Sequence, residues 1–478
     1  MPSADTTYDV LVIGGGVVGC AVLWALAHYD LRLALCEAES DVGQGISRAN
    51  TAIAHTGFDA PPGSLEARLV TTAHQDFARH CADLGVDLRP CGALMLALDD
   101  ADLTQLDAYA RTAALNGIAV ERLDGDTVRA RWPYVNPAVR AGLHIPGEAA
   151  VDSFALTLAY AEVAAEAGAT LLLDERVTAI APHGDRLMVS TTHQQIAARF
   201  VVNAAGLQAA AIARMIGDGS FDIQPRKGQL VVIDPADAPP IDIILLPTPS
   251  PTTKGILIAP AAHGNLLLGP TAEDIADPSD WSTSAVGLAA VGAGAQRLVP
   301  GLASAPAITQ YAGVRSVGSS GDYIIRPAAG CARLVHVAGI RSTGLSASPA
   351  IGAYVAGVLH AQGLELAPRG APLPSRARPP RVADAADDLL ARLVSADADY
   401  GRIVCQCAMV SVGEVRAAIH GAVPARTLDA LKRRLWVMAG PCQGSLCAAR
   451  LTMLLARELG GDPAQVRKHT VGSELLAA

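Results

Sequence analysis

The first forty residues alternate short apolar runs with a glycine turn and a longer apolar segment. Residues 8–13 are almost wholly apolar, which predicts a buried parallel strand. A glycine turn over 14–19 follows, then a helix from Cys20 to about Tyr29 and a second strand over 31–35. A strand, turn, helix and strand in this order predict a βαβ dinucleotide-binding unit.

The glycine turn has the spacing G-x-G-x-x-G. Gly14 permits the tight turn, Gly16 lets the backbone approach a pyrophosphate, and Gly19 allows helix–strand contact. The helix N-terminus that follows attracts phosphate charge. Glu37, just after the second strand, is placed to accept hydrogen bonds from a ribose and to repel a 2′-phosphate. These features predict a dinucleotide site, and the motif by itself leaves NAD and FAD open.

The composition excludes several classes of protein. Of the 478 residues 51% are hydrophobic and 17% are charged, which is enough apolar material for a large core. With a net charge of −9 and no long basic run, nucleic acid is not an expected partner. No membrane span and no signal peptide are expected, because the chain lacks a long apolar run and a basic N-terminal region. The expected location is cytoplasmic, with peripheral docking at the inner membrane face left open.

Four of the nine cysteines lie in two close pairs near the end of the chain. One residue separates Cys405 from Cys407, four separate Cys442 from Cys447, and 34 lie between the pairs. Such pairs suit an iron–sulfur cluster or zinc, and two redox-active thiol pairs are a third alternative. The other cysteines have apolar neighbours and are expected to be buried small hydrophobes: Cys20, Cys36, Cys81, Cys91 and Cys331.

Later apolar segments extend the dinucleotide domain. Residues 200–206, 321–325 and 335–339 read as strands and turns, so the domain is discontinuous. The chain resembles the FAD-dependent family that includes D-amino acid oxidase and glycerol-3-phosphate dehydrogenase. Segment 339–349 is similar to that family's C-terminal flavin loop, and Asp322 matches its late Gly-Asp pair. The resemblance implies FAD, held by Gly14, Gly16, Gly19, Glu37, Ser47, Asn50, Val177, Ala205, Gly206, Asp322, Gly339, Arg341, Gly344 and Leu345.

The expected fold class is α/β, α+β overall, with three parts. A Rossmann-like FAD-binding domain takes residues 1–85, 145–215 and 306–365, and a mixed-sheet substrate domain is inserted over 86–144 and 216–305. Strands of the inserted sheet are expected at 93–98, 229–233, 255–259 and 266–268. A proline-rich linker that continues into a helix occupies 366–399, and a small helical domain with the paired cysteines occupies 400–478.

The polar loop over 47–58 carries the expected base. It is too small and polar for a core helix, and it resembles the family loop that passes the flavin ring. The resemblance implies that His55 removes the substrate's hydroxyl proton, a task that suits an imidazole because its pKa lies near neutral pH. Thr51 is expected either to hydrogen-bond substrate or flavin or to serve as a structural hydroxyl.

Three further positions are expected to contact the substrate. Arg315 resembles the family's substrate-anion arginine, and a guanidinium grips carboxylate or phosphate through two parallel hydrogen bonds. Lys254 and Ser342 are similar to active-site positions of the glycerol-3-phosphate branch, which segments 59–65, 225–229 and 263–274 also resemble.

The spacing of the paired cysteines resembles the bacterioferritin-associated-ferredoxin type of [2Fe-2S] domain, which is appended to several flavin dehydrogenases. It implies that Cys405, Cys407, Cys442 and Cys447 bind the cluster. Helices are expected over 412–420, 426–436 and 442–459, with Cys447 in the first turns of the third.

Three functions remain open from the sequence. The leading one is an FAD-dependent dehydrogenase of a small anionic hydroxy compound, with sn-glycerol 3-phosphate as substrate and a quinone or electron-accepting protein as acceptor. The second keeps the fold and acts on a 2-hydroxy acid such as L-2-hydroxyglutarate, or on an amino or imino acid. The third is a flavin and iron–sulfur redox subunit or sensor without its own turnover. A partner subunit or homo-oligomer is compatible with each.

Overall fold

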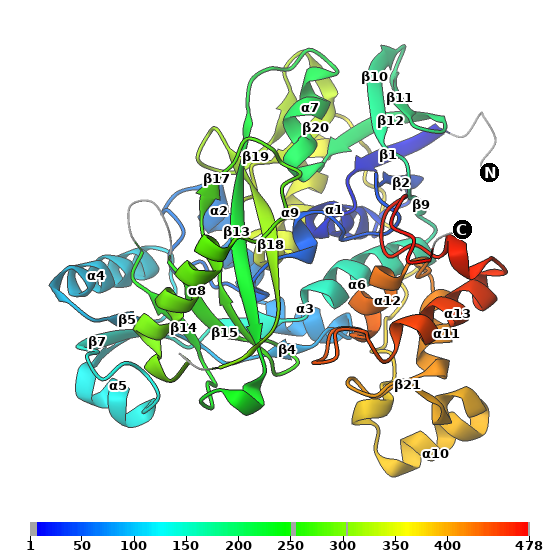
Figure 1. Ribbon diagram of the computed structural model, residues 1–478. Helices are drawn as coiled ribbons and strands as arrows, with labels where there is room; N and C mark the ends of the chain where they lie inside the picture. Colours follow the sequence, from blue (N-terminus) through cyan, green and yellow to red (C-terminus); the bar gives the residue numbers. More distant parts are fainter. Residues whose placement is uncertain (1–6, 250–254, 303–304, 477–478) are drawn as a thin grey trace.

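The apolar run at the start of the chain forms the centre of the first sheet. The computed structural model describes residues 7–249, 255–302 and 305–476 (Figure 1). Strand β1 (Thr7–Ile13) lies between β2 (Leu33–Cys36) and β12 (Gln195–Asn203), parallel to both. The sheet continues through β9 (Thr170–Leu172) on one side and through β20 (Cys331–Ala338), β19 (Ile324–Ala328), β10 (Val177–His183) and β11 (Arg186–Thr191) on the other.

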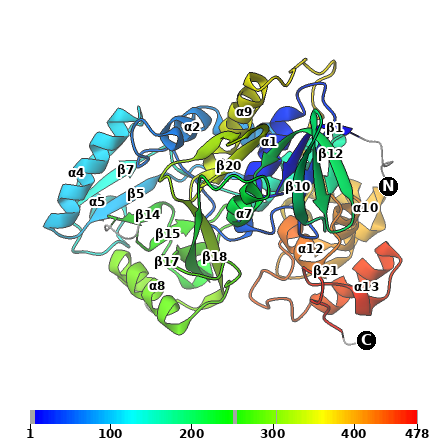
Figure 2. The same ribbon diagram turned by 90° about the horizontal axis from the view of Figure 1, so that it is seen from above.

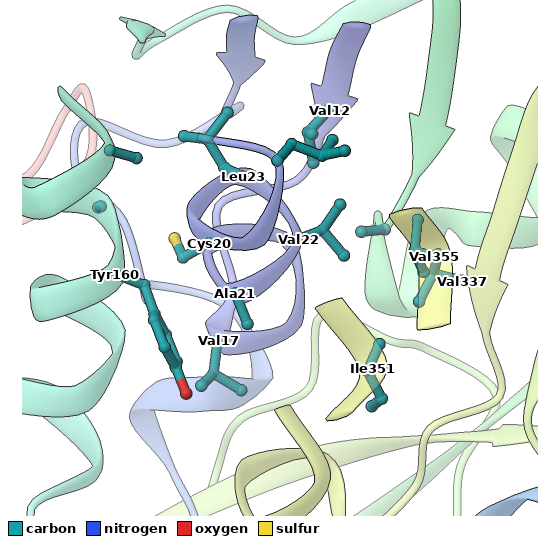
Figure 3. Close-up of a cluster of buried hydrophobic side chains, with 14 of the residues drawn as sticks. Val12, Val17, Cys20, Ala21, Val22, Leu23, Tyr160, Val337, Ile351 and Val355 are labelled. Carbon is teal, nitrogen blue, oxygen red and sulfur yellow. The ribbon is translucent and has the colours of Figure 1, made fainter. Parts of the chain in front are cut away.

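Alternate residues of β1 point to opposite faces of the sheet and contribute to two different apolar cores. Val10 and Val12 face α1 (Val17–Leu26), α6 (Ser153–Glu166) and α9 (Gly344–Ala361), whereas Leu11 and Ile13 face the β10–β11 hairpin and α7 (Ala209–Arg214). Figure 3 shows Val22 of α1 beside Val337, Ile351 and Val355. Helices α2 (Leu65–His74) and α3 (Phe77–Asp83) extend this core. The predicted α/β fold is therefore confirmed, with its parallel strands buried on both faces.

The second sheet is mixed, with parallel and antiparallel strand pairs. Its strands are β17 (Glu273–Asp274), β13 (Ile223–Ile233), β16 (Leu266–Gly269), β15 (Leu257–Pro260), β14 (Ile244–Pro247), β5 (Ala93–Ala97), β7 (Ala141–Ile145) and β6 (Glu121–Asp124) in spatial order, with β18 (Ala307–Gly318) paired to β13. Helices α8 (Ala285–Leu298) and α5 (Gly125–Arg131) pack in one apolar cluster, and α4 (Asp100–Leu115) packs in another.

A small antiparallel sheet joins the two large ones. It consists of β3 (Ile53–Ala54), β8 (Ala149–Val151) and β4 (Leu88–Arg89). Because β3 ends immediately before His55, this sheet fixes the position of the expected base.

Several expected boundaries shift. Helix α1 begins at Val17, ahead of the expected Cys20, because Gly19 already packs as a helical residue on the carbonyl of Gly14. Strand β2 spans Leu33–Cys36 in place of 31–35. Strand β18 pairs with β13 along its whole length, so residues 307–318 belong to the second sheet although the sequence put them in the FAD-binding domain.

The C-terminal region is small and mostly helical. After the linker helix α10 (Asp387–Ala396) come β21 (Ile403–Cys405), β22 (Val410–Ser411), α11 (Val412–Ile419), α12 (Leu428–Leu435) and α13 (Ala448–Leu459). The third helix therefore starts after Cys447 and not at Cys442. The reason is local, since Gln443 and Gly444 have positive φ angles and hold this stretch in turns.

The cysteine-bearing region lies against the first sheet's helices. Helix α12 lies beside α6, at the opposite end of the molecule from α4 (Figures 1 and 2). Trp436, in the left-handed conformation at the end of α12, packs against Phe154 of α6 and His263 of the β15–β16 loop, with ring centroids 5.3 and 5.0 Å away. No helix of the described residues is long and apolar enough to cross a bilayer.

Candidate active site and cysteine cluster

One large cavity, of about 670 Å³, lies between the two sheets. Most of the expected site residues line it: Gly14, Gly16, Glu37, Ser47, Asn50, Thr51, His55, Val177, Ala205, Gly206, Arg315, Arg341, Ser342, Gly344 and Leu345. Gly19, Asp322 and Gly339 do not, and Lys254 lies outside the described residues. The structure thus brings together residues that are spread over three hundred positions of the chain.

The dinucleotide turn opens into this cavity. Gly14 has φ +104°, and a Cβ at Gly19 would lie 1.9 Å from the Gly14 carbonyl oxygen, so both positions require glycine. Glu37 accepts hydrogen bonds from the backbone N–H groups of Gly15 (2.6 Å) and Glu39 (2.9 Å). Burial raises the pKa of Glu37 above its usual value. The turn and its acid therefore form one preassembled unit at the N-terminus of α1.

Asp322 and Gly339 support the cavity from outside it. The Asp322 carboxylate accepts hydrogen bonds from the N–H groups of Leu65 (2.7 Å) and Glu66 (3.0 Å), at the start of α2. Gly339 has φ +69° and packs its backbone against Gly318. Both residues fix the course of the chain before the 340–345 loop, which does line the cavity.

The 46–50 segment is shaped by its own polar side chains. Ser47 Oγ accepts a hydrogen bond from the Val17 N–H (2.9 Å) in the first turn of α1. Asn50 donates to the Ser47 carbonyl (2.8 Å) and accepts from the Ala52 N–H (2.7 Å). These bonds tie the loop to the dinucleotide turn and direct the chain into β3.

His55 is held by a carboxylate that the sequence did not single out. Its Nδ1 lies 2.9 Å from Oε2 of Glu148, whose side chain is fully buried, and its backbone N–H donates to Ser346 Oγ (2.8 Å). The other oxygen of Glu148 accepts from the N–H and the hydroxyl of Thr56 (2.7 and 2.9 Å). With Nδ1–H donated to Glu148, the neutral ring carries its lone pair on Nε2, as a proton acceptor requires.

Arg315 supplies a half-buried positive charge. It lies on β18 directly opposite Arg226 of β13, and Arg226 is paired with Asp274 at 2.6 and 2.9 Å. Burial, and then the charge of Arg226, lower the pKa of Arg315 to about 10. Its Nη2 donates to the Thr271 carbonyl (2.8 Å), and its buried Nε has no hydrogen-bond partner among the described residues. A half-buried guanidinium with an unused, buried donor suits an anionic ligand.

The four paired cysteines approach one another in the fold. Cys407 lies close enough to Cys442 to affect the pKa of its thiol, and Cys405 does the same for Cys447. The Leu446 N–H, the Cys407 thiol and the Gly444 N–H lower the pKa of Cys442 to about 7. Two pairs of thiols, with backbone N–H groups aimed at one of them, fit an anionic cluster that takes two cysteines on each iron. Of the other five cysteines, Cys20, Cys36 and Cys81 are buried as expected, whereas Cys91 and Cys331 are half-buried.

Comparisons with known proteins define the class. Residues 9–358 match the FAD dependent oxidoreductase family, and the chain belongs to that family. Residues 403–457 match the BFD-like [2Fe-2S] binding domain. The chain is therefore an FAD-dependent oxidoreductase with an appended [2Fe-2S] domain, and the expectation of these two cofactors is confirmed.

The chain is similar to several characterised oxidoreductases. The chain is 34% identical to the glycerol 3-phosphate dehydrogenase of Caloramator mitchellensis, over 98% of both chains. It is 26% identical to the L-2-hydroxyglutarate dehydrogenase of Escherichia coli K12, over 55% of this chain and 64% of that one. Among solved structures, the FAD-bound L-α-glycerophosphate oxidase of Mycoplasma pneumoniae has a TM-score of 0.73 at 27% identity, covering 77% of this chain and 97% of that one.

Two contacts of the site were missed from the sequence. Glu148 follows a Pro-Gly turn and belongs to no motif, and it meets His55 across 93 positions of the chain. Ser346, four residues after the expected Ser342, holds the backbone of His55. The acidic residue just before β8 is the one local signal, and it gains meaning only once β3 and β8 are paired.

Proposed function

We propose that this chain is an FAD-dependent dehydrogenase that oxidises sn-glycerol 3-phosphate to dihydroxyacetone phosphate. The observation that carries the proposal is the convergence on one cavity of the His55–Glu148 pair and the half-buried Arg315. Oxidation of a small phosphorylated alcohol requires a base for the hydroxyl proton and a binding site for the phosphate, and both line this cavity.

FAD, when bound, takes up the hydride from the carbinol carbon. The dinucleotide turn, Glu37 and the 340–345 loop are the residues that would hold it, since they line the cavity around the N-termini of α1 and α9. His55 removes the hydroxyl proton at Nε2, and Glu148 orients the ring and stabilises the imidazolium that forms.

Arg315 binds the substrate's phosphate. Arg315 is half-buried and its Nε is shielded from solvent, so an ionic hydrogen bond to an anion is stronger there than at the surface. Thr51 and Ser342 line the same cavity and are assigned to the substrate's hydroxyl groups. The role expected of Lys254 stays a prediction.

The cysteine-bearing region supports a dehydrogenase. The relative that is named a dehydrogenase matches 98% of the chain, whereas the solved oxidase matches 77% of it. A chain with a [2Fe-2S] domain can release electrons one at a time to a quinone or an electron-accepting protein. We therefore assign the acceptor to that class. A redox subunit without turnover has no use for a paired base and anion site.

A 2-hydroxy acid such as L-2-hydroxyglutarate is the competing substrate, because Arg315 can bind a carboxylate equally well. Anaerobic bleaching of the flavin by sn-glycerol 3-phosphate, L-2-hydroxyglutarate and glycine separates the candidates. Fast bleaching by the phosphate ester alone supports the proposal, and bleaching by the hydroxy acid alone overturns it.

The role of His55 is tested by stopped-flow reduction of the FAD-loaded enzyme. We expect His55→Ala to slow flavin reduction by about 10²–10⁴-fold, the usual contribution of a general base, while FAD content stays unchanged. His183→Ala, at an exposed histidine of β10, is the matched control. Equal reduction rates in the two variants would remove His55 from the mechanism.

A further inference from the structure

The four paired cysteines differ in their access to solvent. Cys405 and Cys447 are buried at 1% exposure each, Cys442 is half-buried, and Cys407 is exposed. A cluster on these ligands therefore has an inner edge in the protein and an outer edge at Cys407. One-electron exchange with a second molecule is fastest at the outer edge, where that molecule can come closest.

An exposed stripe of apolar and basic side chains starts beside this edge. Arg450, Met453 and Arg457 follow one another at intervals of three and four, which places them on one face of α13, and Leu446 lies in the turn just before that helix. Leu446 and Met453 are 60% and 58% exposed. Met409, two residues after Cys407, is 47% exposed. Met and Arg are the residue types that protein–protein interfaces favour.

The charge of this region is opposite to that of the rest of the protein. Residues 400–478 contain ten Lys and Arg against five Asp and Glu, a formal charge of +5 in a chain of −9. Residues 1–399 therefore carry −14. Within 400–478, Arg433 and Arg434 are buried against Asp41, so the other eight basic residues against the five acidic ones leave a charge of +3. A basic patch on an acidic protein attracts an acidic molecule to that patch and repels it elsewhere, which both speeds and orients the encounter.

We propose that an acidic electron-carrier protein docks on the α13 stripe, defined as Leu446, Arg450, Met453 and Arg457, and receives electrons at the Cys407 edge. This inference rests on the proposed dehydrogenase function. Each substrate molecule yields two electrons and two protons, so two one-electron carriers dock in succession in each turnover and the protons pass to solvent. A contact of a few side chains matches the small, transient interfaces of redox pairs.

Native and succinylated cytochrome c form a matched pair of probes, because they share one haem and differ in charge, basic against acidic. The holoenzyme is reduced with stoichiometric dithionite, so the result does not depend on the substrate. Stopped-flow mixing then gives the second-order rate for each cytochrome at low and at high salt. Substrate bleaching of the flavin, measured separately, reports on the proposed function alone.

The wild-type enzyme should reduce the succinylated protein about tenfold faster than the native one at low ionic strength, and the preference should vanish in high salt. Arg450→Glu should abolish the preference. Arg392→Glu on α10, an exposed arginine with the same change of charge, should keep it. Leu446→Ser should lower the rate at every salt concentration.

Three results would overturn the proposal. One is an equal rate of reduction for the two cytochromes at low salt. Another is the same preference for the succinylated protein in Arg450→Glu and Arg392→Glu. The third is rapid reoxidation by a soluble quinone analogue with no transfer to either cytochrome, which would assign the Cys407 edge to a quinone. In each case flavin bleaching by substrate would be unchanged, so the proposed function would stand.

Discussion

Replacing Asp41 by Asn should detach the cysteine-bearing region from the flavin domain. The Asp41 side chain is fully buried, and it accepts hydrogen bonds from Arg433 Nη2 (2.9 Å) and from Arg434 Nη1 and Nη2 (2.7 and 3.0 Å). Burial disfavours the charged form, but Arg434 and Arg433 outweigh it and hold the pKa of Asp41 below its usual value. The carboxylate is thus the counter-charge of two guanidinium groups that are themselves buried.

The size of the effect follows from burial. Removing one partner of a buried ion pair costs about 3–5 kcal/mol, because the remaining charge stays desolvated. Every 1.4 kcal/mol is a factor of ten in an equilibrium constant, so the detached population should rise by roughly two to three and a half powers of ten. Asp388→Asn, in an exposed ion pair of α10, should cost less than about 1 kcal/mol and serves as the control.

Denaturant titration with two probes measures this change. Visible circular dichroism of the cluster follows the C-terminal region, and flavin fluorescence follows the first sheet. The Asp41 segment is bonded to the dinucleotide turn through Gly43, whose N–H donates to the Gly15 carbonyl (2.8 Å). We therefore expect the cluster transition to move first and FAD affinity to fall with it. A loss below 1 kcal/mol, equal to that of the control, would refute the reasoning.

The contribution of Asp41 to the attachment of the C-terminal region should depend on pH in a predictable direction. Because the folded pKa of Asp41 is depressed, its contribution is complete above the ordinary aspartate pKa of about 4 and is lost as the pH falls through the folded value. Acid should therefore detach the C-terminal region of the wild-type protein, and Asp41→Asn should remove that part of the acid response.

Three further changes test other parts of the site. Gly19→Ala should prevent FAD binding, measured by flavin content after purification, because its Cβ would lie 1.9 Å from the Gly14 oxygen; retention of FAD would contradict this. Glu148→Gln should slow flavin reduction by about 10²-fold or more with little change in substrate affinity, since the imidazolium of His55 loses its counter-charge; a pure loss of affinity would assign Glu148 to the substrate. Cys405→Ser should remove the visible absorption of the [2Fe-2S] cluster but leave substrate bleaching of the flavin intact, and parallel loss of both would show that the two sites fold together.

Sequence patterns predicted those parts of the structure that depend on residues close together in the chain. The dinucleotide turn follows from glycine spacing, because the residues that need positive φ or close packing are next to one another in the chain. Contacts between distant segments left no such signal. Asp41 and Arg433 are 392 positions apart, and neither belongs to a motif. Asp322 matched a family pair, yet its carboxylate caps α2, since a sequence match fixes the position of a residue and not the direction of its side chain.

The contrast between the two faces of the cysteine-bearing region bears on whether its cluster conducts electrons. The inner face is fixed by buried ions at Asp41 and by Trp436 packed on α6, so its distance from the flavin cavity is set by rigid contacts. A domain that served only to stabilise the fold would gain most from enclosing all four cysteines. Here two are enclosed and Cys407 is exposed beside a basic stripe. A fixed inner distance combined with an open outer edge is the arrangement that favours passage of electrons from an enclosed cavity to the surface.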